Sequence, residues 1–382
     1  MVTRFLRKKM ERIKGKRIIS RLKGGSYMSV YYMVIGVISC LAIFGNLAKR
    51  NTNFNAEGVL CDSEKTAAFL MVWILVLVAG LRYRVGTDYI AYYQNYEAYK
   101  LEKLSLIDEP GIRIIARASS MIYDRPETMI FIAAAITVAI TTICIIKRSD
   151  IYWLSILLYV FTGTWHGCFN GVRQYLAASI LFMGAYAIKE GKFLKWCLFV
   201  TIASMFHITS VIAIFFYFFG RQRISWKQVP ICLFIIIAGV MGYDRIFEMI
   251  GFLQNSEVNT TYSYITNSIN PLRIAVTWVP ILFVLFFYSY FDKEDEKFRF
   301  YFNMTLLNAV LMTVASQSTY LGRIGIYTNV YTTIIWPLLV KKCNVRSQKV
   351  LIAMMLFMYF LYWHTEASGF YLNSFQWIFS HA

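Results

Sequence analysis

Charged residues are scarce in this chain. Only 16% of its 382 residues are Asp, Glu, Lys or Arg, whereas 58% are hydrophobic. A soluble globular domain has about a quarter charged residues, so this balance excludes an ordinary soluble enzyme and a disordered tail. The seven cysteines are scattered, with neither metal-ligand spacing nor the pattern of a disulfide framework. No region alternates apolar and polar residues with a period of two, which excludes a transmembrane β-barrel.

Long apolar runs recur along the whole chain instead. Each is long enough to cross, or nearly cross, a hydrocarbon core of about 30 Å. The sequence therefore predicts an all-α fold, a polytopic bundle of about 11 or 12 membrane helices. The predicted spans are 28–47, 66–81, 129–146, 151–165, 172–188, 193–219, 229–243, 272–291, 298–315, 324–340 and 350–364.

The run 193–219 is too long for one simple crossing, because 27 residues of helix extend about 40 Å. Its middle, residues 204–210, is polar and contains His207 and Thr209. We therefore expect a broken or re-entrant segment near 204–210, made of two short helices that meet inside the membrane. Placing the lysine-rich loops together in the cytoplasm also requires this segment to return to the side where it started.

The two sides predicted in this way differ in their basic residues. The cytoplasmic loops hold 12 Lys and 6 Arg, whereas the opposite side holds 9 Arg and 2 Lys. A guanidinium group is a planar fork of donors that suits phosphate, so the outward excess of arginine indicates anion recognition. The alternative is that these arginines only reach toward the interface from helix ends.

The chain divides into three parts on this interpretation. Residues 28–364 form a single transmembrane domain with an extracytoplasmic amphipathic segment at 82–127, and residues 365–382 form a C-terminal tail. Residues 1–27 are a basic extension with ten basic residues and one acid, Glu11. Such a tail should stay in the cytoplasm, yet the loops place the start of the first span outside. We therefore expect either that translation begins at Met28 or that the extension is a helix on anionic lipid.

Four blocks of sequence, in this order, resemble one known family. They are RYRVGTDYIAYY from Arg82, NGVRQYLAASILFMGAYAIKEGKF from Asn170, Phe-His-Ile-Thr-Ser at 206–210, and GRIGIY from Gly322. Together they are similar to the EpsG-like branch of the Wzy-type polysaccharide polymerases over residues 28–345. The resemblance implies a GT-C-like membrane glycosyltransferase, located in the bacterial cytoplasmic (inner) membrane. Its activity would serve O-antigen, capsule or exopolysaccharide synthesis.

The implied reaction transfers lipid-linked oligosaccharide repeat units from undecaprenyl pyrophosphate to an acceptor repeat unit at the extracytoplasmic face. Its partners would be this lipid-linked substrate, membrane lipid, and a chain-length regulator and flippase, with no nucleic acid. We expect no metal or other cofactor, because the sequence has no Asp-x-Asp pair in a strand context and no metal-spaced cluster. Arginines would then stabilise the charge on the departing pyrophosphate. The arginines predicted to converge on it are Arg82, Arg84, Arg173, Arg273 and Arg323.

The acceptor hydroxyl also needs a base. Asp88 is the first candidate because it follows the arginine-rich turn, and His207 and His166 are the second and third. Asp88 could instead only orient an arginine. Tyr89 and Tyr93 belong to a stripe of tyrosines that either lies along the membrane interface or stacks on sugar rings, and Gln174 is a further predicted sugar contact.

Two other functions fit the same residues. A flippase or other transporter of lipid-linked oligosaccharide would also need arginines in a cavity, and a membrane O-acyltransferase of sugars could use His207 to activate a hydroxyl. Polymer length separates these alternatives. Loss of a flippase removes all surface glycan, loss of a polymerase leaves single repeat units, and loss of an acyltransferase leaves the chain length unchanged.

Overall fold

The computed structural model describes residues 28–51, 60–104, 108–225, 228–242, 268–369 and 375–381. The prediction about residues 1–27 lies outside these ranges. The described residues are helical, and their one extended pairing is an isolated bridge between Arg82 and Trp377. The predicted all-α membrane bundle is confirmed.

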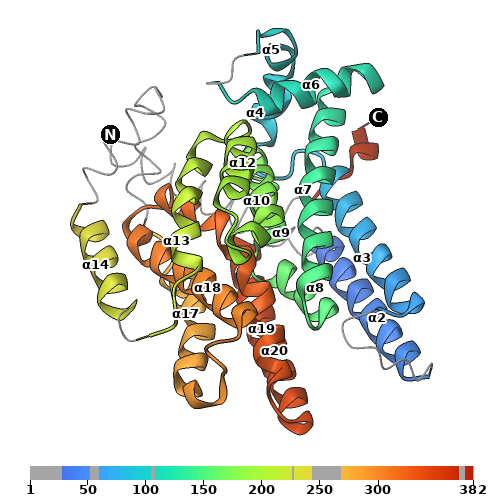
Figure 1. The fold of residues 1–382 in the computed structure, drawn as a ribbon. Coiled ribbons are helices and arrows are strands. Elements are labelled where there is room, and N and C mark those ends of the chain that lie inside the picture. The colour runs from blue at the N-terminus through green and yellow to red at the C-terminus, as the bar shows by residue number, and fades with distance from the viewer. Residues whose placement is uncertain are drawn as a thin grey trace, which may run out of the picture.

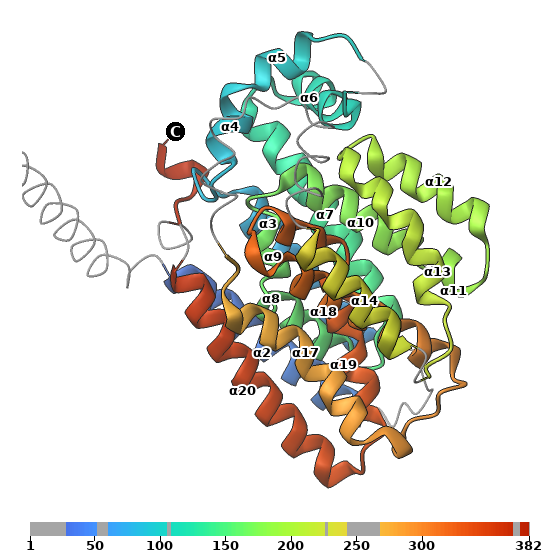
Figure 2. The same cartoon turned by 90° about the vertical axis from the view of Figure 1, so that its left-hand side faces the viewer.

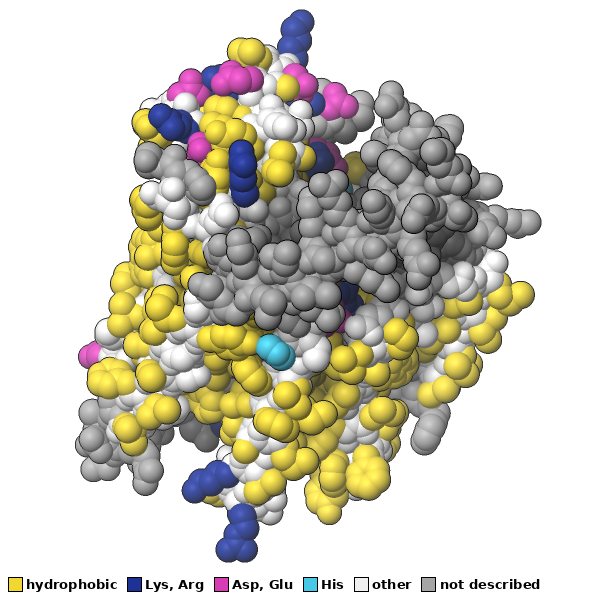
Figure 3. All heavy atoms as spheres, turned by 180° about the vertical axis from the view of Figure 1, so that it is seen from behind, with side chains coloured by type: hydrophobic (Ala, Val, Ile, Leu, Met, Phe, Trp, Pro, Cys, Tyr) yellow, Lys and Arg dark blue, Asp and Glu magenta, His cyan; other side chains and the backbone are white. Residues whose placement is uncertain are grey.

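Four helices, α2, α3, α7 and α20, contain stretches long and apolar enough to cross a membrane. On the face drawn in Figure 3, hydrophobic side chains cover much of the described surface between the two ends, and most of the visible charged side chains lie at those ends. The helices of the bundle are α2 (Ser29–Asn51), α3 (Asp62–Gly80), α7 (Pro126–Arg148), α8 (Tyr152–Phe161), α10 (Val172–Gly184), α14 (Gln228–Met241), α17 (Pro271–Phe286), α18 (Glu296–Val314), α19 (Thr332–Lys341) and α20 (Val345–Gly369).

Local sequence signals explain where several helices begin. Pro126 and Pro271 occupy the first helical positions of α7 and α17, where a missing N–H group costs nothing. The Asn270 side chain accepts a hydrogen bond from the Leu272 N–H at 3.0 Å, and the Asp295 side chain accepts one from the Lys297 N–H at 2.9 Å. These caps satisfy backbone donors that the first turn of a helix leaves without a partner.

One end of the bundle gathers basic loops and is called the lysine-rich end. Lys297 Nζ lies 2.6 Å from Asp150 Oδ1, which joins the first turn of α18 to the loop after α7. Arg148 donates to the Met183 carbonyl at 2.7 Å, and Arg221 donates to the Ile188 carbonyl at 3.0 Å. Through these contacts, several of the loops that the sequence predicts to be cytoplasmic lie together at one end of the bundle.

The run 193–219 forms a re-entrant hairpin. It contains α12 (Phe193–Ser204), a break at 205–207, the 3₁₀ helix η1 (Ile208–Phe215) and α13 (Phe216–Gly220), seen together in Figures 1 and 2. The two limbs are antiparallel, since Trp196 Nε1 donates to the Ala213 carbonyl at 2.9 Å and the Tyr217 hydroxyl donates to the Gly191 carbonyl at 2.8 Å. The predicted break near 204–210 is confirmed, and the chain returns toward its starting side.

The predicted amphipathic segment 82–127 folds into three helices that cover the opposite end of the bundle, here called the roof. These are α4 (Tyr89–Gln94), α5 (Tyr96–Leu101) and α6 (Pro110–Ile122) (Figure 1). Tyr89, Tyr92 and Tyr96 are buried, and Tyr93 is exposed. Most of the tyrosine stripe therefore packs into the protein.

Two boundaries differ from the prediction. The run 324–340 is not one helix: η4 (Leu321–Tyr327) and η5 (Asn329–Tyr331) are 3₁₀ turns that precede α19. Glycine allows this segment to pack closely, because a Cβ at Gly325 would lie 2.6 Å from Met312 Sδ. At the C-terminus, α20 extends beyond 364, and the Ile378 N–H donates to the Leu81 carbonyl at 3.0 Å, so residues of the predicted tail pack on the roof end.

Candidate functional site

A cavity of about 600 Å³ lies beneath the roof end. Its wall combines the turn α9 (Thr164–Gly167) and its neighbours with α17, α18, the 3₁₀ turn η4 and the last turns of α20. Several of its polar side chains come from segments far apart in sequence. These are Thr87, His166, Asn170, Arg273, Asn308, Arg323, Asn329 and Glu366.

Arg273 stands in the first turn of α17 and pairs with Glu366 near the end of α20. Arg273 Nε lies 3.2 Å from Glu366 Oε2, and a terminal guanidinium nitrogen binds the same oxygen. The other oxygen, Oε1, accepts a hydrogen bond from Asn270 Nδ2 at 2.8 Å. Both charged residues line the cavity, so this pair, called the cavity pair, joins α17 and α20 at the cavity wall. Sequence reasoning missed Glu366 because it lies in the predicted tail.

Arg323 reaches the cavity from the unwound segment η4. Its carbonyl accepts a hydrogen bond from Gln174 Nε2 at 2.9 Å, so the first turn of α10 fixes the backbone that carries this arginine. Gln174 is buried and is not part of the cavity wall. Its predicted contact with sugar stays untested, and the structure gives it a backbone-binding role.

Asp88 follows the cavity residue Thr87, and the charges of two arginines act on its carboxyl. The Thr87 hydroxyl donates to Asp88 Oδ1 at 3.1 Å, and the Thr87 N–H donates to Asn170 Oδ1 at 2.7 Å. Burial raises the pKa of the Asp88 carboxyl above its ordinary value, and the charges of Arg323 and Arg173 only partly offset this rise. A carboxylate with a raised pKa is a stronger base.

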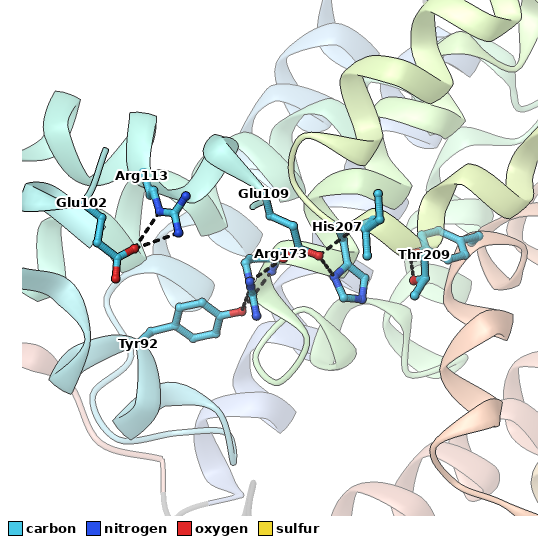
Figure 4. Close-up of polar contacts among 9 residues, drawn as sticks. Tyr92, Glu102, Glu109, Arg113, Arg173, His207 and Thr209 are labelled. Atoms are coloured by element: carbon cyan, nitrogen blue, oxygen red, sulfur yellow. Dashed lines mark hydrogen bonds and ion pairs between the residues drawn. The ribbon is translucent and has the colours of Figure 1, made fainter. Parts of the chain in front are cut away.

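A second cluster joins the roof to the re-entrant hairpin and is called the roof latch. It consists of Glu109, Arg173, His207 and Tyr92 (Figure 4). Glu109 Oε2 binds Arg173 Nη1, and Oε1 accepts from His207 Nδ1 at 2.9 Å and from the Ile208 N–H at 2.8 Å. Arg173 Nε also donates to the Tyr92 hydroxyl at 3.2 Å. Three segments thus meet at one carboxylate.

The charge of Glu109 follows from these partners. Burial by itself would raise the pKa of its carboxyl, but the His207 hydrogen bond, the Arg173 charge and the Ile208 N–H outweigh burial, so the pKa lies below its ordinary value. Glu109 is therefore ionised near neutral pH. Its sequence context gave no signal, since it is one of several acids in a charge-balanced loop.

Arg82 and Arg84 lie outside the cavity wall. The Arg82 side chain is 1% exposed, donates to the Ala79 and Val85 carbonyls, and stacks 4.8 Å from the centre of the Phe169 ring. Arg84 is exposed and lies 5.3 Å from the centre of the Tyr83 ring. Of the five arginines predicted to converge, Arg273 and Arg323 share the cavity and Arg173 stands beside it. Binding of pyrophosphate by any of these five arginines stays a prediction.

The remaining predicted site residues also divide into residues that line the cavity and residues that lie outside its wall. His166 lines the cavity and accepts a hydrogen bond from Trp363 Nε1 at 3.4 Å. His207 belongs to the roof latch, and Tyr89 stacks on Tyr93 at 6.3 Å between ring centres, away from the cavity wall. The structure therefore groups Asp88 and His166 with the cavity.

The chain is similar to one established family. No curated protein and no solved structure matches it, so the predicted GT-C-like arrangement stays untested. The model of the EpsG family matches residues 65–378, which include the cavity, the roof and the re-entrant hairpin. The chain therefore belongs to the EpsG family, a family of membrane proteins in polysaccharide biosynthesis.

Proposed function

We propose that this protein is a polysaccharide polymerase that joins lipid-linked oligosaccharide repeat units. The donor glycan leaves undecaprenyl pyrophosphate and is transferred to an acceptor repeat unit. The single observation that supports this proposal most is the pair Arg273 and Arg323, which reach one cavity from separate helical segments. A volume of about 600 Å³ falls within the usual range for small-molecule pockets, enough for a diphosphate and the adjoining sugar.

The two arginines would act on the leaving group. As the acceptor oxygen bonds to the anomeric carbon, the bond from that carbon to the pyrophosphate oxygen breaks, and the electron pair leaves with the pyrophosphate. Guanidinium groups held in a partly dry cavity stabilise this charge more than water does, because their donors are already oriented. Glu366 keeps Arg273 in place at the cavity wall.

Asp88 is the proposed base. It lies beside the cavity wall at Thr87, and its raised pKa favours removal of the acceptor proton. His166, which lines the cavity, and His207, which is bound to Glu109, are the alternatives. Polymerisation would take place at the roof end, which we assign to the outer face of a bacterial cytoplasmic membrane. A flippase and a chain-length regulator would supply and limit its substrate.

Reconstitution tests this function. The purified protein would be placed in liposomes with an undecaprenyl-pyrophosphate-linked repeat unit, and mass spectrometry would follow the products. We expect two repeat units on one carrier together with free undecaprenyl pyrophosphate. Arg323→Ala should abolish this product, whereas Arg113→Ala, which changes a roof arginine that is not part of the cavity wall, should retain it.

Other outcomes identify the alternatives. Movement of the lipid-linked substrate across the bilayer without a longer glycan would indicate a flippase. A single repeat unit that gains the mass of an acyl group would indicate an O-acyltransferase. Either result would contradict the polymerase proposal.

A further inference from the structure

The Glu109 backbone adopts an unusual conformation. Its φ is +53° and its ψ is +63°, in the left-handed region that non-glycine residues seldom occupy. A conformation of this kind is costly and persists only where surrounding contacts hold it. The three hydrogen-bond donors on the Glu109 carboxylate are such contacts. The chain therefore holds this carboxylate at a defined place.

Arg173 and the proposed base share a neighbour, because the Tyr92 hydroxyl binds Arg173 and the Tyr92 N–H donates to the Asp88 carbonyl at 3.1 Å. The Arg173 charge acts on Asp88, and the next residue, Gln174, holds the backbone of Arg323. Two roof residues fix the Arg173 guanidinium: Glu109 binds Nη1, and the Tyr92 hydroxyl binds Nε. The position of Arg173 relative to Asp88 therefore depends on the roof.

The docking of the roof on the hairpin does not depend on Glu109 alone. The Gly111 N–H donates to the Met205 carbonyl at 2.8 Å, and the Phe206 ring fills the space in front of Gly111. Glu109 can therefore lose its charge while the roof keeps this backbone contact with the hairpin tip. This separation allows the role of the charge to be tested apart from the role of the fold.

We propose that Glu109 is a positioning residue, which holds Arg173 beside Asp88 and couples this arginine to the tip of the re-entrant hairpin. The role rests on the proposed polymerase function. In this role, Arg173 orients the Asp88 carboxylate. Loss of the Glu109 charge frees Arg173 to form a closer pair with Asp88, which weakens Asp88 as a base without removing any group that binds the donor diphosphate.

The roof offers a matched control. Glu102 pairs with Arg113 at 2.8 Å, also through an Arg–Glu contact, but neither residue is part of the latch (Figure 4). Glu109→Gln and Glu102→Gln therefore remove the same charge from the same layer. Glutamine keeps an oxygen that can accept from the Ile208 N–H, whereas its NH2 group cannot accept from Arg173, so Glu109→Gln removes the charge and the bond to Arg173.

The experiment measures polymerisation in liposomes containing wild type, Glu109→Gln or Glu102→Gln. We expect Glu109→Gln to lower kcat at least tenfold with a KM for the lipid-linked donor within twofold of wild type, and Glu102→Gln to leave both unchanged. Size-exclusion chromatography verifies that each variant is folded. Tyr92→Phe removes only the hydroxyl that binds Arg173, and it should lower kcat by a smaller factor in the same way.

A double-mutant cycle shows whether Glu109 acts through Arg173. If it does, Glu109→Gln lowers kcat in the wild type but adds little to Arg173→Ala. Multiplicative losses in the double variant, or wild-type kcat in both Glu109→Gln and Tyr92→Phe, would overturn the proposal. A wild type that joins no repeat units overturns the polymerase function and this role with it, whereas an active wild type with unchanged kcat in both Glu109→Gln and Tyr92→Phe overturns this role alone.

Discussion

Two Arg–Glu pairs with the same chemistry serve different parts of the molecule. In the roof latch, the Arg173 and Glu109 side chains are 34% and 12% exposed, and in the cavity pair, the Arg273 and Glu366 side chains are 33% and 15% exposed. Burial therefore does not distinguish them. Their surroundings do, since the cavity pair faces an open volume and the latch carboxylate is surrounded by protein donors.

This difference teaches how to interpret a buried ion pair. An ion pair between protein groups is weak evidence for stability, because desolvation offsets much of the Coulomb attraction. The function of each pair lies in what it holds. Glu366 keeps a cation at the cavity wall, and Glu109 joins the roof, α10 and the re-entrant hairpin.

Removal of the Arg273 side chain should have the largest effect on polymerisation among the variants that follow. We expect Arg273→Ala to lower polymerisation turnover by about 100-fold or more, since an oriented donor to the leaving group is lost. The measurement is product formation in liposomes at equal protein content. Arg84→Ala, at an exposed arginine outside the cavity wall, is the control. Turnover of Arg273→Ala within threefold of wild type would contradict a role at the leaving group.

Gly111→Ala breaks the latch region sterically. An added Cβ would collide with the Phe206 ring, so the roof must shift away from the hairpin tip. We expect a loss of stability of about 1–3 kcal/mol, typical of overpacking. Thermal melting in detergent measures it. Gly36→Ala is the control because a Cβ there meets nothing within 4 Å, and an unchanged melting temperature in both variants would mean that the roof is loosely packed.

Acid should weaken the latch in a predictable direction. The pKa of Glu109 is lowered from its ordinary 4.5, so its stabilising contribution is complete above pH 4.5 and is lost as the pH falls through the lowered value. The melting-temperature difference between wild type and Glu109→Gln should be constant at higher pH and shrink on acidification. A melting-temperature difference that grows on acidification would contradict a lowered pKa of Glu109 in the folded protein.

The smallest effect is expected where the hairpin touches the unwound segment. The Thr209 and Tyr327 hydroxyls lie 2.7 Å apart, and Thr209→Val removes this hydrogen bond. We expect a loss of about 1 kcal/mol of stability, with turnover within about threefold of wild type. Thr201→Val, which removes a hydroxyl bond on the exposed side of α12, serves as the comparison. A tenfold loss of turnover would place this contact in the catalytic machinery.

Much of the fold could be predicted from hydrophobicity because each apolar run must form helices to satisfy its backbone. The break at His207 was predictable for the same reason, since polar residues interrupt an overlong run. The unwound part of 324–340 was not predicted, because its residues are mostly apolar and the close packing at Gly322 and Gly325 depends on residues far away in the sequence.

The site was predicted less completely. Arg273 and Arg323 could be identified because arginine is unusual at the start of an apolar segment. Arg82 also borders an apolar segment, at its end, yet its donors bind carbonyls of its own turn, which sequence spacing does not reveal. Glu109 and Glu366 could not be found, since their partners come from segments about 60 to 100 residues away.

The hairpin between α12 and α13 also has a consequence for counting crossings. The two limbs of the hairpin begin and end at the same end of the bundle. The hairpin therefore leaves the chain on the side of the membrane where it entered, and it does not change the side assigned to any later loop. A hydropathy plot that scores 193–219 as a single traverse would invert all downstream assignments, and reporter fusions before and after this segment should give identical signals.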